Sequence, residues 1–139
     1  MKSDAQVLLV GKDETLLHTR KLILGTYFQV DVAGRVSHAA QMMAERRFDL
    51  IVLCSSLSED ECERVAELAR TQNPRPKTLT LSAMGRQSCG HGAGDELTEE
   101  IGPLALARKA AAMLGLEVKP NGRGISEARL GESEKLQPQ

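Results

Sequence analysis

Apolar residues recur along the chain in short runs that are separated by longer segments with helical spacing. Residues 7–10 and 50–53 contain no polar side chain, which is typical of strands buried on both faces of a parallel sheet. Residues 28–32 alternate between apolar and polar and predict a strand at an outer position. Residues 78–81 predict a fourth strand and residues 96–98 a weak fifth one.

The intervals between these strands carry helical spacing and recognisable helix starts. Residues 13–24 form the first helix, with an acidic residue near its positive end. Ser37 is the expected N-cap of the second helix. Ser58 is expected to begin the third, with Glu61 at the capping-box position, and Pro103 the last. Residues 84–94 are rich in Gly and small polar residues, so we expect a loop in place of a helix before the fifth strand.

Alternating strands and helices predict an α/β domain with a parallel sheet, right-handed crossovers and helices on both faces. We expect this domain to span residues 1–117. Residues 118–139 are polar, with few apolar side chains, and predict a disordered C-terminal tail. In such sheets a site lies beyond the carboxyl ends of the strands, which here fall near Gly11, Cys54 and Ser82.

Composition narrows the possible partners. The 139 residues carry a formal net charge of -1, which argues against a broad nucleic-acid footprint or a polybasic membrane patch. No apolar stretch approaches the ~20 residues of a membrane helix. The three cysteines, at positions 54, 62 and 89, match neither a disulfide framework nor a metal knuckle, so a reducing cytoplasm is the expected location.

Four stretches, residues 7–14, 48–54, 79–83 and 92–99, resemble the receiver domains of bacterial two-component response regulators. Together they extend over residues 5–116. The resemblance implies a flavodoxin-like (βα)5 three-layer sandwich with a five-stranded parallel sheet, in which the fourth helix is eroded. It also implies a role in signal transduction.

The phosphoacceptor pocket that the resemblance implies has lost most of its functional groups. Receivers place two carboxylates after the first strand, an acceptor Asp at the end of the third, a hydroxyl after the fourth and a Lys after the fifth, around a Mg²⁺ ion. These positions fall here on Gly11, Lys12, Cys54, Ser82 and Glu99. Because only the hydroxyl of Ser82 is kept, the pocket is degenerate, and we expect neither a metal nor a cofactor.

Asp13 and Glu14 are a candidate for the acidic pair displaced by two residues. Such a shift at a helix start moves a side chain by more than half a turn, and Mg²⁺ tolerates little error in its octahedral geometry. The acceptor carboxylate at position 54 would still be missing. The aromatic reporter of receivers falls on Glu96.

Two hypotheses concern the substituted positions. Lys12 and Glu99 reverse the charges of the family pocket and either form an ion pair across its mouth or both point into solvent. Cys54 is either a redox-sensitive thiol that Lys12 activates or a small hydrophobic side chain that fills space at a strand end.

The sequence therefore predicts a pseudo-receiver: a phosphorylation-independent signalling or protein-interaction module rather than an enzyme. A partner protein or a second copy would bind the face made by the fourth helix, fifth strand and fifth helix of a receiver. The alternative is a thiol-based redox sensor centred on Cys54. A weaker third hypothesis is a small-ligand binder that uses the crevice at the strand ends.

Overall fold

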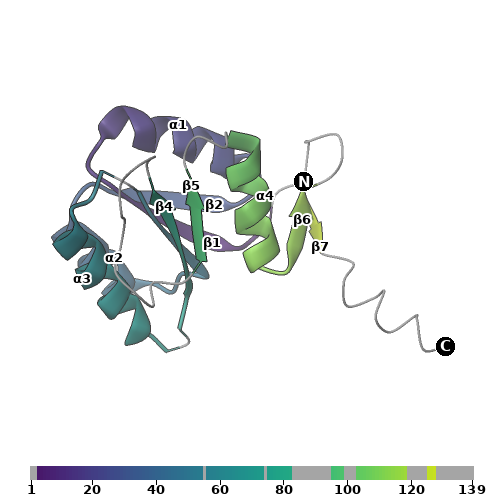
Figure 1. The fold of residues 1–139 in the computed structure, drawn as a ribbon. Coiled ribbons are helices and arrows are strands. Elements are labelled where there is room, and N and C mark those ends of the chain that lie inside the picture. Colours follow the sequence, from purple (N-terminus) through teal and green to yellow (C-terminus); the bar gives the residue numbers. More distant parts are fainter. Residues whose placement is uncertain are drawn as a thin grey trace.

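Strands and helices alternate along residues 6–82, as the sequence predicts (Figure 1). The computed structural model describes residues 3–54, 56–73, 75–82, 95–98, 103–118 and 125–127. The elements are β1 (Gln6–Val10), α1 (Glu14–Gly25), β2 (Gln29–Ala33), α2 (Val36–Glu45), β3 (Leu50–Leu53), α3 (Glu59–Arg70), β4 (Lys77–Ser82), β5 (Asp95–Thr98), α4 (Pro103–Met113), β6 (Leu116–Val118) and β7 (Ile125–Glu127).

The first five strands form one parallel sheet in the order β2-β1-β3-β4-β5. This order reverses direction between β1 and β3, which is the flavodoxin-like arrangement and places the ligand-binding crevice of such folds at that point. The prediction of a flavodoxin-like sheet of five parallel strands is therefore confirmed, and β2 lies at an edge as its alternating pattern indicates.

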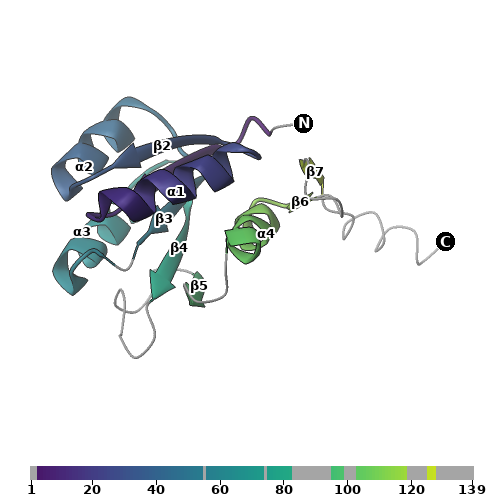
Figure 2. The same ribbon diagram turned by 90° about the horizontal axis from the view of Figure 1, so that it is seen from above.

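Helices cover both faces of this sheet, as the two perpendicular views show (Figures 1 and 2). Val7 and Leu9 of β1 pack in the apolar cluster that includes side chains of α1 and α4. Leu8 and Val10 pack in a second cluster that includes side chains of α2 and α3. Successive side chains of a strand point to opposite faces, so a strand covered on both sides must be apolar at every position. This explains the unbroken apolar run of β1.

Three of the four predicted helix starts are confirmed, including that of α4 at Pro103, and one is wrong. Asp13 caps α1, and Ser58 and Glu61 form the predicted capping box of α3. Ser37 is not the N-cap of α2. The N-cap is Arg35, two residues earlier, the helix begins at Val36, and the Arg35 side chain makes no capping hydrogen bond. Val36 is buried in the cluster of α2 and α3, so packing rather than capping fixes this helix start.

A small antiparallel sheet of β6 and β7 follows α4 and does not form part of the sequence prediction. Val118 of β6 is buried in the cluster of α1 and α4, which anchors β6 to the domain. The composition of residues 118–139 predicts disorder, whereas Ile125–Glu127 pair as a strand. The expected loss of the helix before β5 falls on residues 83–94, outside the described residues. Within the described ranges, no helix is long and apolar enough to cross a membrane.

Candidate functional site

The strand ends of β1 and β3 lie directly beside each other at the carboxyl edge of the sheet. Val10 and Leu53 are partners in the parallel register, and the Cys54 N–H donates a hydrogen bond of 2.9 Å to the Val10 carbonyl oxygen. Gly11 and Cys54, which follow these two strands, are therefore brought together. The resemblance places the first carboxylate and the phosphoacceptor of a receiver at these two positions.

Gly11 is packed so closely that it leaves no room for a side chain. A Cβ atom at this position would lie 2.9 Å from the Cys54 Cβ, 3.0 Å from the Ser56 Oγ and 3.3 Å from the Cys54 Sγ. Carbon atoms in good contact are separated by ~3.5–4.0 Å. The glycine thus permits the two loops to approach, and a carboxylate at this position would require Cys54 and Ser56 to move.

Cys54 is a buried thiol that belongs to the apolar cluster on the α1 and α4 side of the sheet. Only 3% of its surface is exposed, which is the environment of a space-filling cysteine rather than a reactive one. The redox hypothesis gains no support from this position. Cys62 of α3, in contrast, is disulfide-bonded, which the spacing of the three cysteines does not predict.

Lys12 pairs with an acidic residue of α3. Its Nζ lies 3.1 Å from Glu61 Oε1, and the two side chains are 49% and 24% exposed. The hypothesised partner, Glu99, lies outside the described residues, so a Lys12–Glu99 pair stays a hypothesis. The structure shows that the charge of Lys12 is directed to the start of α3.

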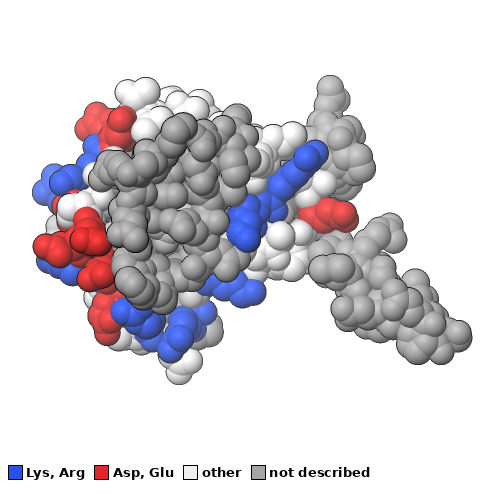
Figure 3. Space-filling model, in the orientation of Figure 1, with Lys and Arg blue, Asp and Glu red and all other residues white. Residues whose placement is uncertain are grey.

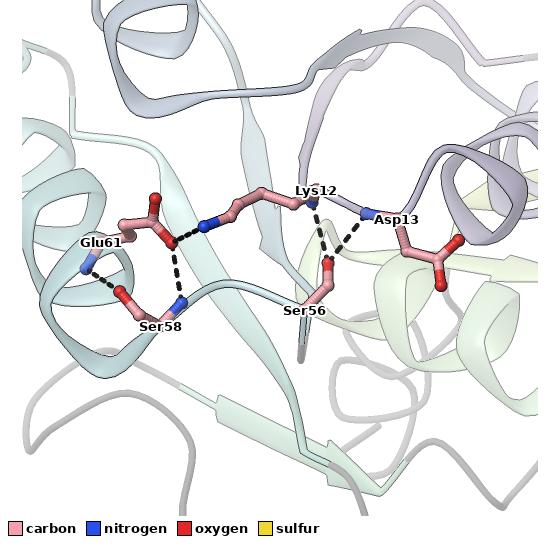
Figure 4. A network of polar contacts seen from close by, with 5 residues as sticks. All are labelled: Lys12, Asp13, Ser56, Ser58 and Glu61. Atoms are coloured by element: carbon pink, nitrogen blue, oxygen red, sulfur yellow. Dashed lines mark hydrogen bonds and ion pairs between the residues drawn. The ribbon is translucent and has the colours of Figure 1, made fainter.

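A set of polar contacts joins the loop after β1 to the loop after β3 (Figure 4). Ser56 Oγ accepts hydrogen bonds from the backbone N–H of Lys12 (2.8 Å) and of Asp13 (3.3 Å). In the capping box, Glu61 Oε1 accepts from the Ser58 N–H (2.9 Å) and Ser58 Oγ accepts from the Glu61 N–H (3.1 Å). We call Lys12, Asp13, Ser56, Ser58 and Glu61 the inter-loop network.

The inter-loop network lowers the pKa of Glu61 below its usual value. The largest cause is the hydrogen bond from the Ser58 backbone N–H, and the hydrogen bond from the Lys12 ammonium adds to it. Both favour the charged form of the carboxyl group. Glu61 is thereby kept ionised, which preserves its ion pair with Lys12.

The sequence identifies parts of this network but not its connections. Glu61 is recognised there as a capping-box residue only, and nothing in the spacing singles out Ser56. The hydrogen bond from the Lys12 N–H to Ser56 Oγ joins residues 44 positions apart in the sequence, and its geometry depends on the register of β1 and β3. A hydroxyl three residues after a predicted strand end is the only signal, and it is too common to be informative.

Asp13 and Ser82 are the other candidate site residues whose positions the structure describes. Asp13 Oδ1 accepts a hydrogen bond of 3.1 Å from the Leu16 N–H, so this carboxylate caps α1. Ser82 ends β4, next to Thr98 of β5 in the register. Among the residues that the structure describes, no group of three or more His, Cys, Asp and Glu side chains is arranged to hold a metal ion.

Comparisons with known proteins bear on the fold. No protein-family model and no curated protein matches the chain in sequence. Solved structures similar to this chain include a response regulator from Chloroflexus aurantiacus, a CheY-like receiver domain from Methanospirillum hungatei and a receiver domain from Francisella. The respective TM-scores are 0.68, 0.68 and 0.65, at 20%, 21% and 18% identity.

These similarities extend over most of both partners in each comparison. They cover 81%, 81% and 79% of this chain and 98%, 94% and 96% of the three structures, respectively. The strand order and the helices on both faces of the sheet agree with that architecture. The chain therefore has the CheY-like fold of response regulator receiver domains.

Proposed function

We propose that this chain is a phosphorylation-independent pseudo-receiver, a signal-transduction or protein-interaction module of a two-component-like pathway and not an enzyme. Its receiver fold supports the signalling class, since the similar solved structures are response regulators by name. The observation that carries the proposal is the close packing of Cys54 and Ser56 against Gly11.

The chemistry of the pocket residues supports this proposal. Transfer of a phosphoryl group to a receiver requires an acceptor carboxylate and a divalent cation that neutralises the phosphoryl oxygens. By the resemblance, Cys54 falls at the acceptor position and Lys12 at a position where the cation site would need a carboxylate; the Lys12 ammonium is paired with Glu61. Ser82 alone retains a matching functional group, and a single hydroxyl cannot hold the cation.

Incubation with acetyl phosphate and Mg²⁺ is expected to leave the mass of the intact protein unchanged, because no carboxylate stands at the acceptor position. The measurement is intact-protein mass spectrometry, with a phosphorylatable receiver domain as the positive control. A stable mass gain of one phosphate that maps to residues near the carboxyl edge of the sheet would refute the proposal.

The proposed partner surface includes the described residues of α4, which follows β5 and so stands where a receiver has its fifth helix. Leu104 is a large apolar side chain that is 41% exposed, and two basic residues, Arg108 and Lys109, follow on the same helix. Figure 3 shows Lys and Arg side chains on the surface around α4. An apolar side chain with charged neighbours is a common centre of a protein interface. We propose that a partner protein or a second copy of this chain contacts this surface.

Leu104→Glu is expected to weaken partner binding or self-association at least tenfold, because it places a charge at the centre of the proposed interface. Affinity capture followed by titration, and analytical ultracentrifugation for self-association, measure the effect. Leu22→Glu is the matched control, since Leu22 is exposed on α1. Equal loss for both variants, or no loss for Leu104→Glu, would place the interface elsewhere.

We also propose a cytoplasmic location and a function without nucleic acid or membrane binding. A near-neutral net charge supports the absence of a nucleic-acid footprint. Disulfides are rare in reducing compartments, so the state of Cys62, which is disulfide-bonded in the structure, tests the location. The measurement is a count of the free thiols in protein isolated from cells under alkylating conditions. A free Cys62 thiol would support the cytoplasmic location, and an oxidised Cys62 would contradict it.

A further inference from the structure

We propose that the inter-loop network is a built-in latch that holds the loop after β1, the loop after β3 and the first turn of α3 in one arrangement without any bound ligand. This inference deepens the proposed function and rests on it, since a module that is not switched by phosphorylation needs its own means of fixing these loops. Three sets of contacts carry it.

The first set is the pair of hydrogen bonds to Ser56. Its Oγ accepts from two consecutive backbone N–H groups, those of Lys12 and Asp13, at 2.8 and 3.3 Å. Asp13 is itself the N-cap of α1. One hydroxyl group of the loop after β3 therefore fixes the whole turn from β1 into α1.

The second set couples Lys12 to the start of α3 through a single atom. Glu61 Oε1 accepts from the Ser58 N–H at 2.9 Å and lies 3.1 Å from Lys12 Nζ. The same oxygen thus serves the capping box and the ion pair (Figure 4). Movement of Lys12 changes the electrostatic environment of the cap, and loss of the cap releases the partner of Lys12.

The third set is the van der Waals contact at Gly11. The missing side chain at this position lets the backbone of the first loop lie against Cys54 and Ser56. This contact sets the distance at which the Ser56 hydroxyl reaches the two N–H groups. Packing, hydrogen bonds and an ion pair therefore act on the same two loops, and all three are supplied by the chain itself.

Amide hydrogen exchange of the full chain, followed by NMR, tests the latch. In Ser56→Ala the amides of Lys12 and Asp13 lose their acceptor, and their exchange is expected to accelerate about fivefold to tenfold. In Lys12→Met the side chain keeps most of its length but loses its charge, and the Ser58 amide is expected to exchange about twofold to threefold faster, as suits a partly exposed ion pair.

Lys21→Met is the matched control, because Lys21 is an exposed lysine of α1 outside the inter-loop network. It is expected to leave the exchange of all these amides unchanged. The double variant Lys12→Met/Glu61→Gln is expected to accelerate exchange in the loop after β1 no more than either single variant, since both remove one shared ion pair.

Two results would overturn the latch: unchanged exchange of the Lys12 and Asp13 amides in Ser56→Ala, or an unchanged Ser58 amide in Lys12→Met. Lys12→Met alters an exposed side chain, so the test does not depend on whether Ser56→Ala folds. These readouts are separate from phosphorylation. A protein that gains phosphate but shows the expected exchange would refute the proposed function and keep the latch, and the reverse pattern would do the opposite.

Discussion

Gly11→Ala is expected to lower the free energy of unfolding by about 1–3 kcal/mol, the usual cost of adding a methyl group to a tightly packed site. The added Cβ would lie 2.9 Å from the Cys54 Cβ, and that atom is fixed to the backbone of the neighbouring loop. Neither loop can relax without breaking contacts of the inter-loop network. Urea unfolding followed by circular dichroism measures the change.

Gly34→Ala provides the matched control for Gly11→Ala. Among the described residues, a Cβ at Gly34 would come within 4 Å of the Gly11 carbonyl oxygen alone, at 3.9 Å, which is an ordinary contact. Since alanine also restricts the unfolded chain, this variant is expected to be neutral or slightly more stable, by up to about 1 kcal/mol. Equal stabilities of the two variants would show that the approach at Gly11 is looser than the structure indicates.

Cys54→Asp restores the acceptor residue of a receiver and is nevertheless expected to lower the free energy of unfolding by about 2–4 kcal/mol near neutral pH, because it places a carboxylate in a buried apolar site. We also expect no phosphorylation by acetyl phosphate and Mg²⁺, since Gly11 and Lys12 supply no carboxylate for the cation. Thermal or urea unfolding and intact mass spectrometry measure the two outcomes.

The destabilisation by Cys54→Asp is expected to increase with pH. Burial would raise the pKa of the new carboxyl group above its unfolded value, so the unfolded state would release its proton at lower pH. Raising the pH through this interval then favours the unfolded state. Cys54→Ala, which introduces no charge, is the control and should show no such pH dependence. Phosphorylation of Cys54→Asp by acetyl phosphate would contradict this expectation. It would mean that the chain lacks only the acceptor carboxylate and can still bind the cation.

Gly11→Ala and Cys54→Asp together show what restoring a receiver pocket in this chain would require. Gly11, Cys54 and Ser56 occupy one space and must change together, because a side chain at position 11 meets both of the others. Lys12 in turn is bound to Glu61, which also caps α3. A single substitution toward the receiver pattern therefore conflicts with contacts that the present residues make.

The sequence predicts the elements of this fold well because the signals are local. The apolar runs of β1 and β3 and the capping box at Ser58 and Glu61 each depend on residues close in sequence. The start of α2 is predicted wrongly, since Val36 packs into the core and its burial outweighs the capping preference of Ser37. The pairing of β6 with β7 is missed because both strands are short and the surrounding composition is polar.

By itself, then, the sequence determined the order of the first five strands and of the helices between them as far as β4, since these follow from residue types and their spacing. Its resemblance to receiver domains implied the architecture and the absence of acidic residues at positions 11, 12 and 54. Only the tertiary structure decided what replaces them. Contacts across 44 or more positions, such as Ser56 to Lys12 and Glu61 to Lys12, depend on the register of β1 and β3 and on the direction in which α3 leaves the sheet. A hydrogen bond requires a donor and an acceptor within about 3 Å, and the register that brings distant residues so close is set by packing of the whole sheet.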